Sequence, residues 1–225
     1  MEFSPVWLTL KLAGITVLIL LLIGTPMAWW LATTQRRFKP VIESIVALPL
    51  VLPPTVLGFY MLILLSPNQP LGSLWLSLTG DTLTFSFSGL VLASIIYSLP
   101  FVVQPLQTAF AGIGQGRLEA AATLGATPLD AFFSVISPLA VRGYLTAIVL
   151  GFAHTVGEFG VVLMVGGNIP QRTRVISIAI YEQVETLNYT EAHLFSAGLL
   201  IFSFVVLLVV YIANQRTPLT LSGSS

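Results

Sequence analysis

Long apolar stretches separated by short polar segments run through the whole chain. Between Leu12 and Thr34 there is no charged side chain, and four later stretches have a similar length and character. A helix needs about 20 apolar residues to cross the hydrocarbon core, and lipid offers the backbone no hydrogen-bond partners. Each stretch therefore predicts a membrane-spanning helix. The expected spans are about 6–33, 43–66, 87–112, 140–166 and 193–213.

Composition supports this interpretation. Hydrophobic residues make up 56% of the chain and charged residues only 8%, whereas a soluble domain carries about a quarter charged residues. We expect an all-α integral membrane protein in which 1–225 forms a single domain with five transmembrane helices. The start, MEFSPVW, lacks a cationic region, so the first span is expected to be a retained anchor rather than a removed signal peptide.

Charge and cysteine content narrow the possible functions. The formal net charge is zero, which gives no case for a nucleic-acid partner. The chain has no cysteine, which excludes disulfides, thiolate metal ligands and a thiol nucleophile. Its two histidines are far apart, so no metal site is expected.

The basic residues set the expected orientation, because cytoplasmic loops carry an excess of lysine and arginine. Placing the link after the first span inside puts the amino terminus outside and the carboxyl terminus inside. The basic residues on the inner side are then Arg36, Arg37, Lys39, Arg117, Arg142 and Arg216. Arg172 and Arg174 lie in an outer loop, 167–192, and Lys11 can extend to the outer interface.

Proline is concentrated in the second span. Pro49, Pro53 and Pro54 fall within six residues, and an internal proline removes a backbone hydrogen bond and kinks a helix. We favour a bent helix that lines a pathway, with Pro53 and Pro54 as pathway candidates. The alternative is that these prolines reflect only the higher frequency of proline in membrane helices.

The polar segment between the third and fourth spans predicts two short helices joined by a turn. Leu118–Leu124 is rich in alanine, a strong helix former, and Gly125 can adopt the left-handed conformation that ends a helix. Thr127 then caps a second helix, with Pro128 at its first position and Asp130 three residues after the cap. From these residues alone, an ordinary amphipathic loop helix is equally compatible.

The loop 114–138 resembles the EAA loop of ABC-importer permeases, written EAA-x3-G-x9-I-x-L-P. The matching positions are Glu119, Ala120, Ala121, Gly125 and Pro138. Val135 and Ser137 replace the isoleucine and leucine of the pattern, and neither change removes the turn. The resemblance implies a type I ABC-importer permease fold with a cytoplasmic coupling helix that docks on an ATP-binding subunit.

Further segments resemble the molybdate permease subfamily. They are LPLVLPPTVLGFY (48–60), FSFSGLVLAS (85–94), TLGATPLDAFF (123–133), GEFG (157–160) and NIPQRTRVISIAIY (168–181). The implied cargo is molybdate or tungstate, and sulfate or thiosulfate permeases are the alternative. The implied partners are a second copy of the chain, two ATP-binding subunits and a periplasmic or extracellular molybdate-binding protein. The implied location is a bacterial or archaeal cytoplasmic membrane.

ATP hydrolysis is expected on a separate subunit, because the chain contains no phosphate-cradling G-x-x-x-x-G-K-[ST] loop. No cofactor is expected on this chain. An intramembrane enzyme would need paired catalytic groups, and the only candidates are His154 and Glu158 without a nucleophile. A membrane scaffold is a more distant alternative, and it would not require the glycine and alanine pattern of the loop.

Glu158 is the one acidic residue well inside a span, where a carboxylate is costly and suggests a function. Gly157 and Gly160 beside it allow the helix to unwind or to approach another helix closely. We therefore expect a gate at 157–160.

A fixed negative charge would repel a dianion, so Glu158 could instead pair with Arg172 or Arg174, accept hydrogen bonds from a broken helix end, or be protonated. The alternative is a structural glutamate near the outer interface. His154, one turn earlier, could hydrogen-bond to it.

Arg172 and Arg174 are candidates for the outer mouth, where they could attract an anion or a binding protein. They could instead pair with Glu182 and Glu185, or contact lipid headgroups. The segment VISIAIYEQVE predicts a short re-entrant or interfacial helix rather than a sixth span.

Overall fold

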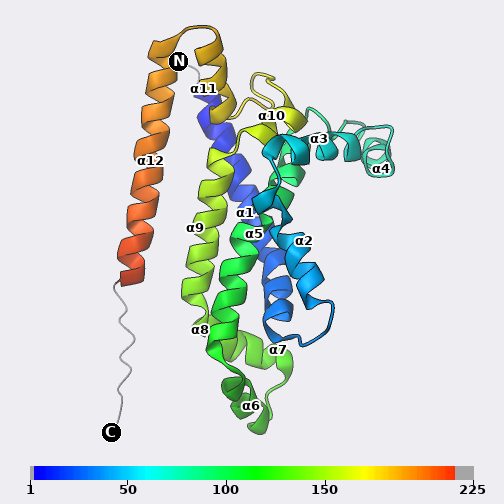
Figure 1. Ribbon diagram of the computed structural model, residues 1–225, viewed down its shortest axis with the longest axis vertical. Coiled ribbons are helices and arrows are strands. Elements are labelled where there is room, and N and C mark those ends of the chain that lie inside the picture. Colours follow the sequence, from blue (N-terminus) through cyan, green and yellow to red (C-terminus); the bar gives the residue numbers. More distant parts are fainter. Residues whose placement is uncertain (1–2, 216–225) are drawn as a thin grey trace.

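The computed structural model describes residues 3–215, and every regular element in that range is helical (Figure 1). Arg216, predicted to lie on the inner side, is outside the described residues. The helices are α1 (Ser4–Thr33), α2 (Lys39–Val51), α3 (Pro54–Leu64), α4 (Pro70–Thr79), α5 (Phe87–Ile113), α6 (Gln115–Thr123), α7 (Pro128–Ala131), α8 (Ser137–Leu139), α9 (Val141–Gly157), α10 (Gly160–Gly166), α11 (Ile176–Glu185) and α12 (Tyr189–Gln215). A π-helical segment, Phe132–Ile136, joins α7 to α8.

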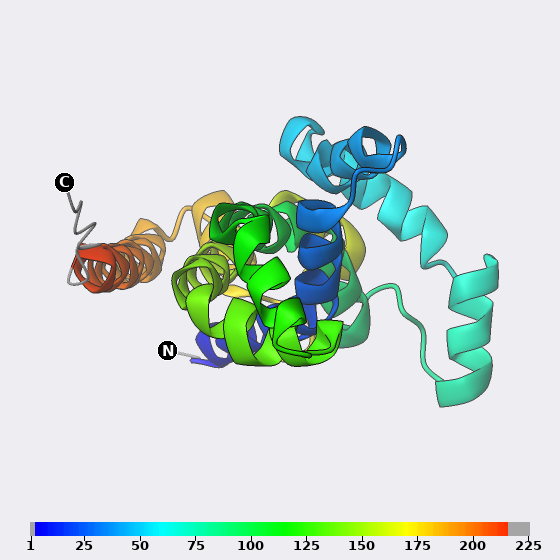
Figure 2. The same cartoon turned by 90° about the horizontal axis from the view of Figure 1, so that it is seen from below.

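Helices α1, α5 and α9 stand side by side and form the core (Figures 1 and 2). Small residues let α9 approach α5 closely. A Cβ atom on Gly151 would lie 2.7 Å from a Val102 methyl group, and one on Gly143 would lie 2.3 Å from the Ala109 Cβ atom. Close backbone approach at small residues is how membrane helices gain packing contacts, since lipid tails give no hydrophobic drive for helix association. The packing of α9 against α5 is therefore determined by the complementary shapes of their surfaces.

The number of spans agrees with five. Three helices are long and apolar enough to cross a membrane, and two bent helix pairs bring the total to five if each pair counts as one span. The bent pairs are α2 with α3, at 112°, and the α7–α8 segment with α9, at 71°. The all-helical class is thus confirmed. Residues 140–166 are not one continuous helix, because α9 ends at Gly157 and α10 begins at Gly160.

Internal prolines have two different outcomes. Pro26 lies within α1, and Pro100 and Pro105 lie within α5, without ending either helix. At Pro53–Pro54 the chain does leave the helix, with Leu52 and Pro53 extended at ψ 135° and 136°. A residue that precedes proline is disfavoured in the helical region, so two consecutive prolines force two extended residues. The bend predicted for the second span is confirmed.

Two further short helices, α4 and α11, lie outside the long spans. The predicted interfacial helix is present as α11, which packs against α12 and α1. Helix α4 was not predicted, because its ten residues are too short for a span. It begins at Pro70 and ends at Gly80, which has a φ of +72°. In Figures 1 and 2, α4 stands away from the bundle.

The last helix has the fewest contacts among the long ones. Only 6% of the most apolar window of α12 is buried against the rest of the described chain. It contacts α9 and α11, including an aromatic contact of 6.2 Å between the rings of Phe152 and Phe202. It stands to one side of the bundle in both views (Figures 1 and 2). Most of its apolar surface is therefore free to face lipid.

Candidate functional site

The helices α6 to α8 lie at the end of the molecule opposite to the amino terminus (Figure 1). The predicted helix–turn–helix is present. Gly125 has a φ of +88°, which favours glycine because a Cβ atom there meets the following carbonyl group. The Thr127 hydroxyl accepts a hydrogen bond from the backbone N–H of Asp130 at 3.2 Å. Local sequence chemistry therefore determines this turn.

One part of the capping prediction is wrong. The carboxylate of Asp130 does not return to the backbone of Thr127, because it accepts a hydrogen bond from the Ser134 hydroxyl at 3.0 Å. The helix also continues through the π-helical segment into α8. Its side chains divide between two environments: Ile136 is fully buried and Phe132 contacts Trp29, whereas Phe133 is 68% exposed.

The positions that carry the EAA resemblance lie mostly on the surface. Glu119, Ala120, Gly125 and Pro138 are exposed, and Ala121 is buried. Beside them are three large apolar side chains that the described chain leaves in the open: Leu124 (88% exposed), Leu129 (72%) and Phe133 (68%). We call these three residues the docking face. An exposed apolar patch at one end of a molecule is typical of an interaction site.

The two interrupted helices meet each other. A Cβ atom on Gly160 would lie only 2.7 Å from the Cβ atom of Pro54, so the start of α10 rests directly on the start of α3. Pro53 provides the extended residue just before this contact. Gly157 differs from Gly160, because a Cβ atom there would meet nothing within 4 Å. The structure thus brings Pro53, Pro54 and Gly160 together and leaves Gly157 beside open space.

Glu158 occupies the break between α9 and α10, in an extended conformation with ψ 133°. Its side chain is 4% exposed, and its Oε2 accepts a hydrogen bond from the Ser94 hydroxyl at 3.0 Å. Its carbonyl oxygen accepts one from the Ser177 hydroxyl at 2.5 Å. Its Oε1 has no hydrogen-bond partner among the described residues. Glu158 therefore joins the broken helix end to α5 and α11.

The predicted hydrogen bond between His154 and Glu158 is wrong. Helix α9 ends at Gly157, so Glu158 does not continue the face on which His154 lies. The Nδ1 atom of His154 lies 2.9 Å from the Ser98 hydroxyl, and its ring stacks on Phe101 at 3.8 Å. Ser98 also bonds to the Thr155 hydroxyl at 3.0 Å.

These polar side chains form two hydrogen-bonded groups at the end of α9, which we together call the break cluster. One group is Ser94, Glu158 and Ser177, and the other is Ser98, His154 and Thr155. Sequence reasoning missed the hydroxyl residues of this cluster. The signal that could have found two of them is the spacing of Ser94 and Ser98, which places both on one face of an apolar helix. Their partners lie 64 and 56 residues further along the chain.

The two outer arginines are both ion-paired. The Nη2 atom of Arg172 donates to both carboxylate oxygens of Asp81, at 2.6 and 2.8 Å. The predicted pairing of Arg172 with Glu182 or Glu185 is therefore wrong. Arg174 lies 3.1 Å from Glu182, as predicted, and its Nε donates to Asn168. Glu185 accepts a hydrogen bond from Tyr181 instead. A backbone hydrogen bond from Thr82 and the Arg172 side chain hold the pKa of Asp81 below its ordinary value of 3.8.

A groove of about 460 Å³ runs between α2, α5 and α9. Four polar or charged side chains line it together with apolar ones. The four are Gln104, Thr108, Arg142 and Thr146. Within residues 3–215 no group of three or more His, Asp or Glu side chains could hold a metal ion.

Comparison with known proteins identifies related chains. Residues 13–217 match a family described as binding-protein-dependent transport system inner membrane component. A molybdenum transport system permease protein from Azotobacter vinelandii is 56% identical over 214 residues, which cover 95% of both chains. A sulfate transport system permease protein from Synechocystis is 34% identical, over 85% of this chain and 67% of its own.

A solved structure of the inward-facing MetNI methionine ABC transporter has the same fold. Its TM-score is 0.73, with 19% identity and 95% of both chains covered. At that identity the likeness concerns the fold alone. The helical arrangement described above is therefore a fold that this solved transporter structure shares.

Proposed function

This chain belongs to the family of binding-protein-dependent transport system inner membrane components, and on that premise we propose that it is the permease subunit of an ATP-driven importer of molybdate or tungstate. The observation that carries the proposal is the 56% identity with a molybdenum permease across 95% of both chains. The identity with the sulfate permease is 34%. The proposal includes both oxyanions because the two dianions have nearly the same size and charge.

The proposed assembly has two copies of the chain, two ATP-binding subunits and one oxyanion-binding protein outside the membrane. Its location is the cytoplasmic (inner) membrane of a bacterium or archaeon. The ATP-binding subunits hydrolyse ATP, and each contacts the docking face of one permease chain. This arrangement explains why Leu124, Leu129 and Phe133 are exposed in a single chain. A scaffold protein would have no need of such a face next to the EAA positions.

The groove between α2, α5 and α9 is the proposed inner half of the pathway. Gln104 offers amide N–H donors to oxyanion oxygens, and Arg142 lies beside it in the groove. The Thr108 and Thr146 hydroxyls donate to backbone carbonyl groups of their own helices, so they can contribute acceptor oxygens to water in the groove. Polar side chains at this depth are costly in contact with lipid, and a water-filled pathway removes that cost.

The proposed gate is the contact between the two helix breaks. Movement of the docking face passes through the π-helical segment and α8 to α9, because these elements are continuous in the chain. The far end of α9 is held to α5 and α11 by Glu158, and α10 is held to α3 by Gly160. Displacement of α9 would therefore change both contacts together. Arg172 and Arg174 organise the outer loops through their ion pairs.

Reconstitution tests the function. The complete importer, with its ATP-binding subunits and binding protein, is placed in liposomes, and ATP hydrolysis and oxyanion uptake are measured. We expect molybdate and tungstate to stimulate both, and sulfate to stimulate neither. Stimulation by sulfate without stimulation by molybdate would contradict the assignment. An importer that lacks only the binding protein is the control for unstimulated hydrolysis.

A further inference from the structure

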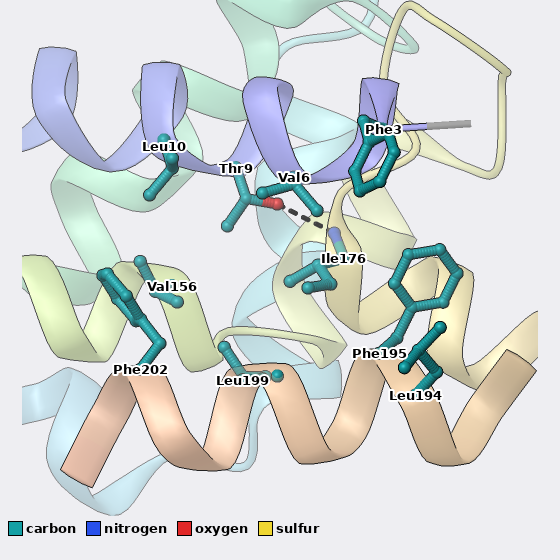
Figure 3. Close-up of a pocket in the computed structure, with 11 residues that line it drawn as sticks. Phe3, Val6, Thr9, Leu10, Val156, Ile176, Leu194, Phe195, Leu199 and Phe202 are labelled. Atoms are coloured by element: carbon teal, nitrogen blue, oxygen red, sulfur yellow. Dashed lines mark hydrogen bonds between the residues drawn. The ribbon is translucent and has the colours of Figure 1, made fainter. Parts of the chain in front are cut away.

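A second site lies at the outer end of the molecule, on the side away from the polar groove. It consists of an apolar groove of about 420 Å³ between α1 and α12, whose floor is formed by α9 and the start of α11 (Figure 3). Apart from Thr9 and Gly198, every residue that lines it is apolar. The Thr9 hydroxyl is engaged, because it accepts from the Ile176 N–H and donates to the Pro5 carbonyl group. The groove therefore offers an occupant no free polar group.

A polar pocket adjoins this groove. It has a volume of about 260 Å³ and shares Phe195 with the groove. Arg174, Glu182, Gln183 and Glu191 lie around it, with Pro5 of α1 opposite. In Figure 3, Phe195 projects from the start of α12 toward Phe3 at the amino-terminal end of α1. The combined site has a long apolar body and a polar head at the outer end of two membrane helices.

We propose that this combined site binds one aminophospholipid, with an acyl chain in the groove and an ethanolamine headgroup in the polar pocket. The apolar part opens toward the bilayer, because α12 is barely covered by the described chain. The polar part lies at the level of the headgroups, where α1 and α12 begin. A phospholipid has this division between an apolar body and a polar tip, and it is present at high concentration beside the groove.

Charge in the pocket selects the headgroup. One arginine and two carboxylates give a net charge of −1 around it. Glu191 has no ion pair among the described residues, so it can bind an ammonium group. The Nε atom of Arg174 donates to Asn168, and its Nη1 atom is paired with Glu182. Its Nη2 atom has no acceptor among the described residues. Nη2 can bind the lipid phosphate.

Other headgroups fit less well. A phosphatidylcholine head carries the positive charge but has no N–H donor for Glu191 and Gln183. A phosphatidylglycerol head has no positive charge, and a pocket of net negative charge repels it. Phosphatidylethanolamine supplies an ammonium group with three donors, like that of lysine. The geometry therefore favours the ethanolamine lipid over both of the others.

Native mass spectrometry tests this site. The full chain is purified within its importer complex from nanodiscs that contain equal amounts of phosphatidylethanolamine, phosphatidylglycerol and phosphatidylcholine. We expect retained lipid to be enriched several-fold in phosphatidylethanolamine. Equal retention of all three lipids, or no retained lipid, would overturn the proposal.

Two variants address the two halves of the site separately. Gly198→Leu should reduce the amount of lipid retained, because its side chain enters the groove, and a Cβ atom there meets nothing within 4 Å. Gly14→Leu is the matched control, since Gly14 also has nothing within 4 Å and does not line the groove. Glu191→Gln should leave the amount of lipid unchanged and remove the preference for ethanolamine.

The same variants separate lipid from another occupant. If a helix of a second copy fills the groove, Gly198→Leu will weaken self-association and leave lipid retention unchanged. That result would overturn the proposal. Unchanged headgroup preference in Glu191→Gln would overturn the assignment of the polar pocket. Both variants test the site even if oxyanion uptake is unaffected, because the quantity measured is bound lipid.

Discussion

The break cluster lies inside the helical bundle, and its polar side chains form two hydrogen-bonded groups. The docking face lies at one end of the molecule and leaves large apolar side chains exposed. In the first region Ser94 and Ser98 are fully buried and Glu158 is 4% exposed. In the second, Leu124 is 88% exposed. The hydrogen bonds of the break cluster are all made within one chain. The side chains of the docking face gain burial only in the proposed assembly.

This difference predicts different consequences of mutation. Changes in or beside the break cluster should lower the free energy of unfolding of the chain itself. Changes in the docking face should leave that free energy almost unchanged and weaken association. The predictions that follow are ordered by their expected effect on stability.

Gly160→Leu should have the largest effect. Its side chain would collide with Pro54, since even a Cβ atom lies 2.7 Å away, and overpacking of this kind costs about 1–3 kcal/mol. Thermal unfolding in detergent measures the loss. Gly157→Leu is the matched control, because a Cβ atom at Gly157 has nothing within 4 Å. Equal destabilisation by both variants would show that the contact with Pro54 is not the cause.

The hydrogen bond between Ser94 and Glu158 should contribute about 1 kcal/mol to stability. A double-mutant cycle of Ser94→Ala and Glu158→Ala measures this coupling, because each substitution removes one partner of the bond and interacting sites are not additive. The cycle of Ser134→Ala with Glu158→Ala is the control, since Ser134 bonds to Asp130 instead. If the Ser94 and Glu158 substitutions are strictly additive, the bond does not hold the break together.

Leu129→Glu should change the free energy of unfolding by less than about 0.5 kcal/mol, as for other surface sites. It should nevertheless abolish co-purification of the ATP-binding subunit, because it places a charge in the docking face. Leu78→Glu on α4 is the control: Leu78 is 74% exposed and Leu129 is 72% exposed. Normal co-purification with Leu129→Glu would contradict the proposal that the docking face contacts the ATP-binding subunit.

The ion pair between Asp81 and Arg172 should give the smallest effect, visible only in acid. The pKa of Asp81 is lowered in the folded chain by the Thr82 N–H and by Arg172. Its stabilising contribution is therefore present above the ordinary value of 3.8 and is lost as pH falls through the lower, folded value. The difference in Tm between the wild type and Asp81→Asn should shrink from pH ~5 to pH ~3. A constant difference would contradict it.

Sequence predicted the features that local chemistry determines. The spans follow from the requirements of lipid, the bend at Pro53–Pro54 from consecutive prolines, and the turn at Gly125 from conformation alone. Long-range pairing was not predictable. Ser94 meets Glu158 across 64 positions and Arg172 meets Asp81 across 91, and no local pattern connects either pair.

The missed features share a second cause. Ten residues of moderate apolarity gave no signal for α4, although Pro70 and Gly80 mark its ends. Gly157 and Gly160 suggested that the helix could break. They did not indicate that the break would separate His154 from Glu158. A break changes which residues share a face, so a pairing argued from helical spacing fails at that point.

The 71° bend between the α7–α8 segment and α9 makes these elements a lever. Helix α9 has 17 residues, which corresponds to a length of about 25 Å. A rotation of about 10° at its lower end would therefore shift its upper end by about 4 Å, from the same rise per residue. Such a shift exceeds the 3.0 Å that now separates Ser94 from Glu158. A rotation of α9 by about 10° is thus enough to break the hydrogen bond between Ser94 and Glu158.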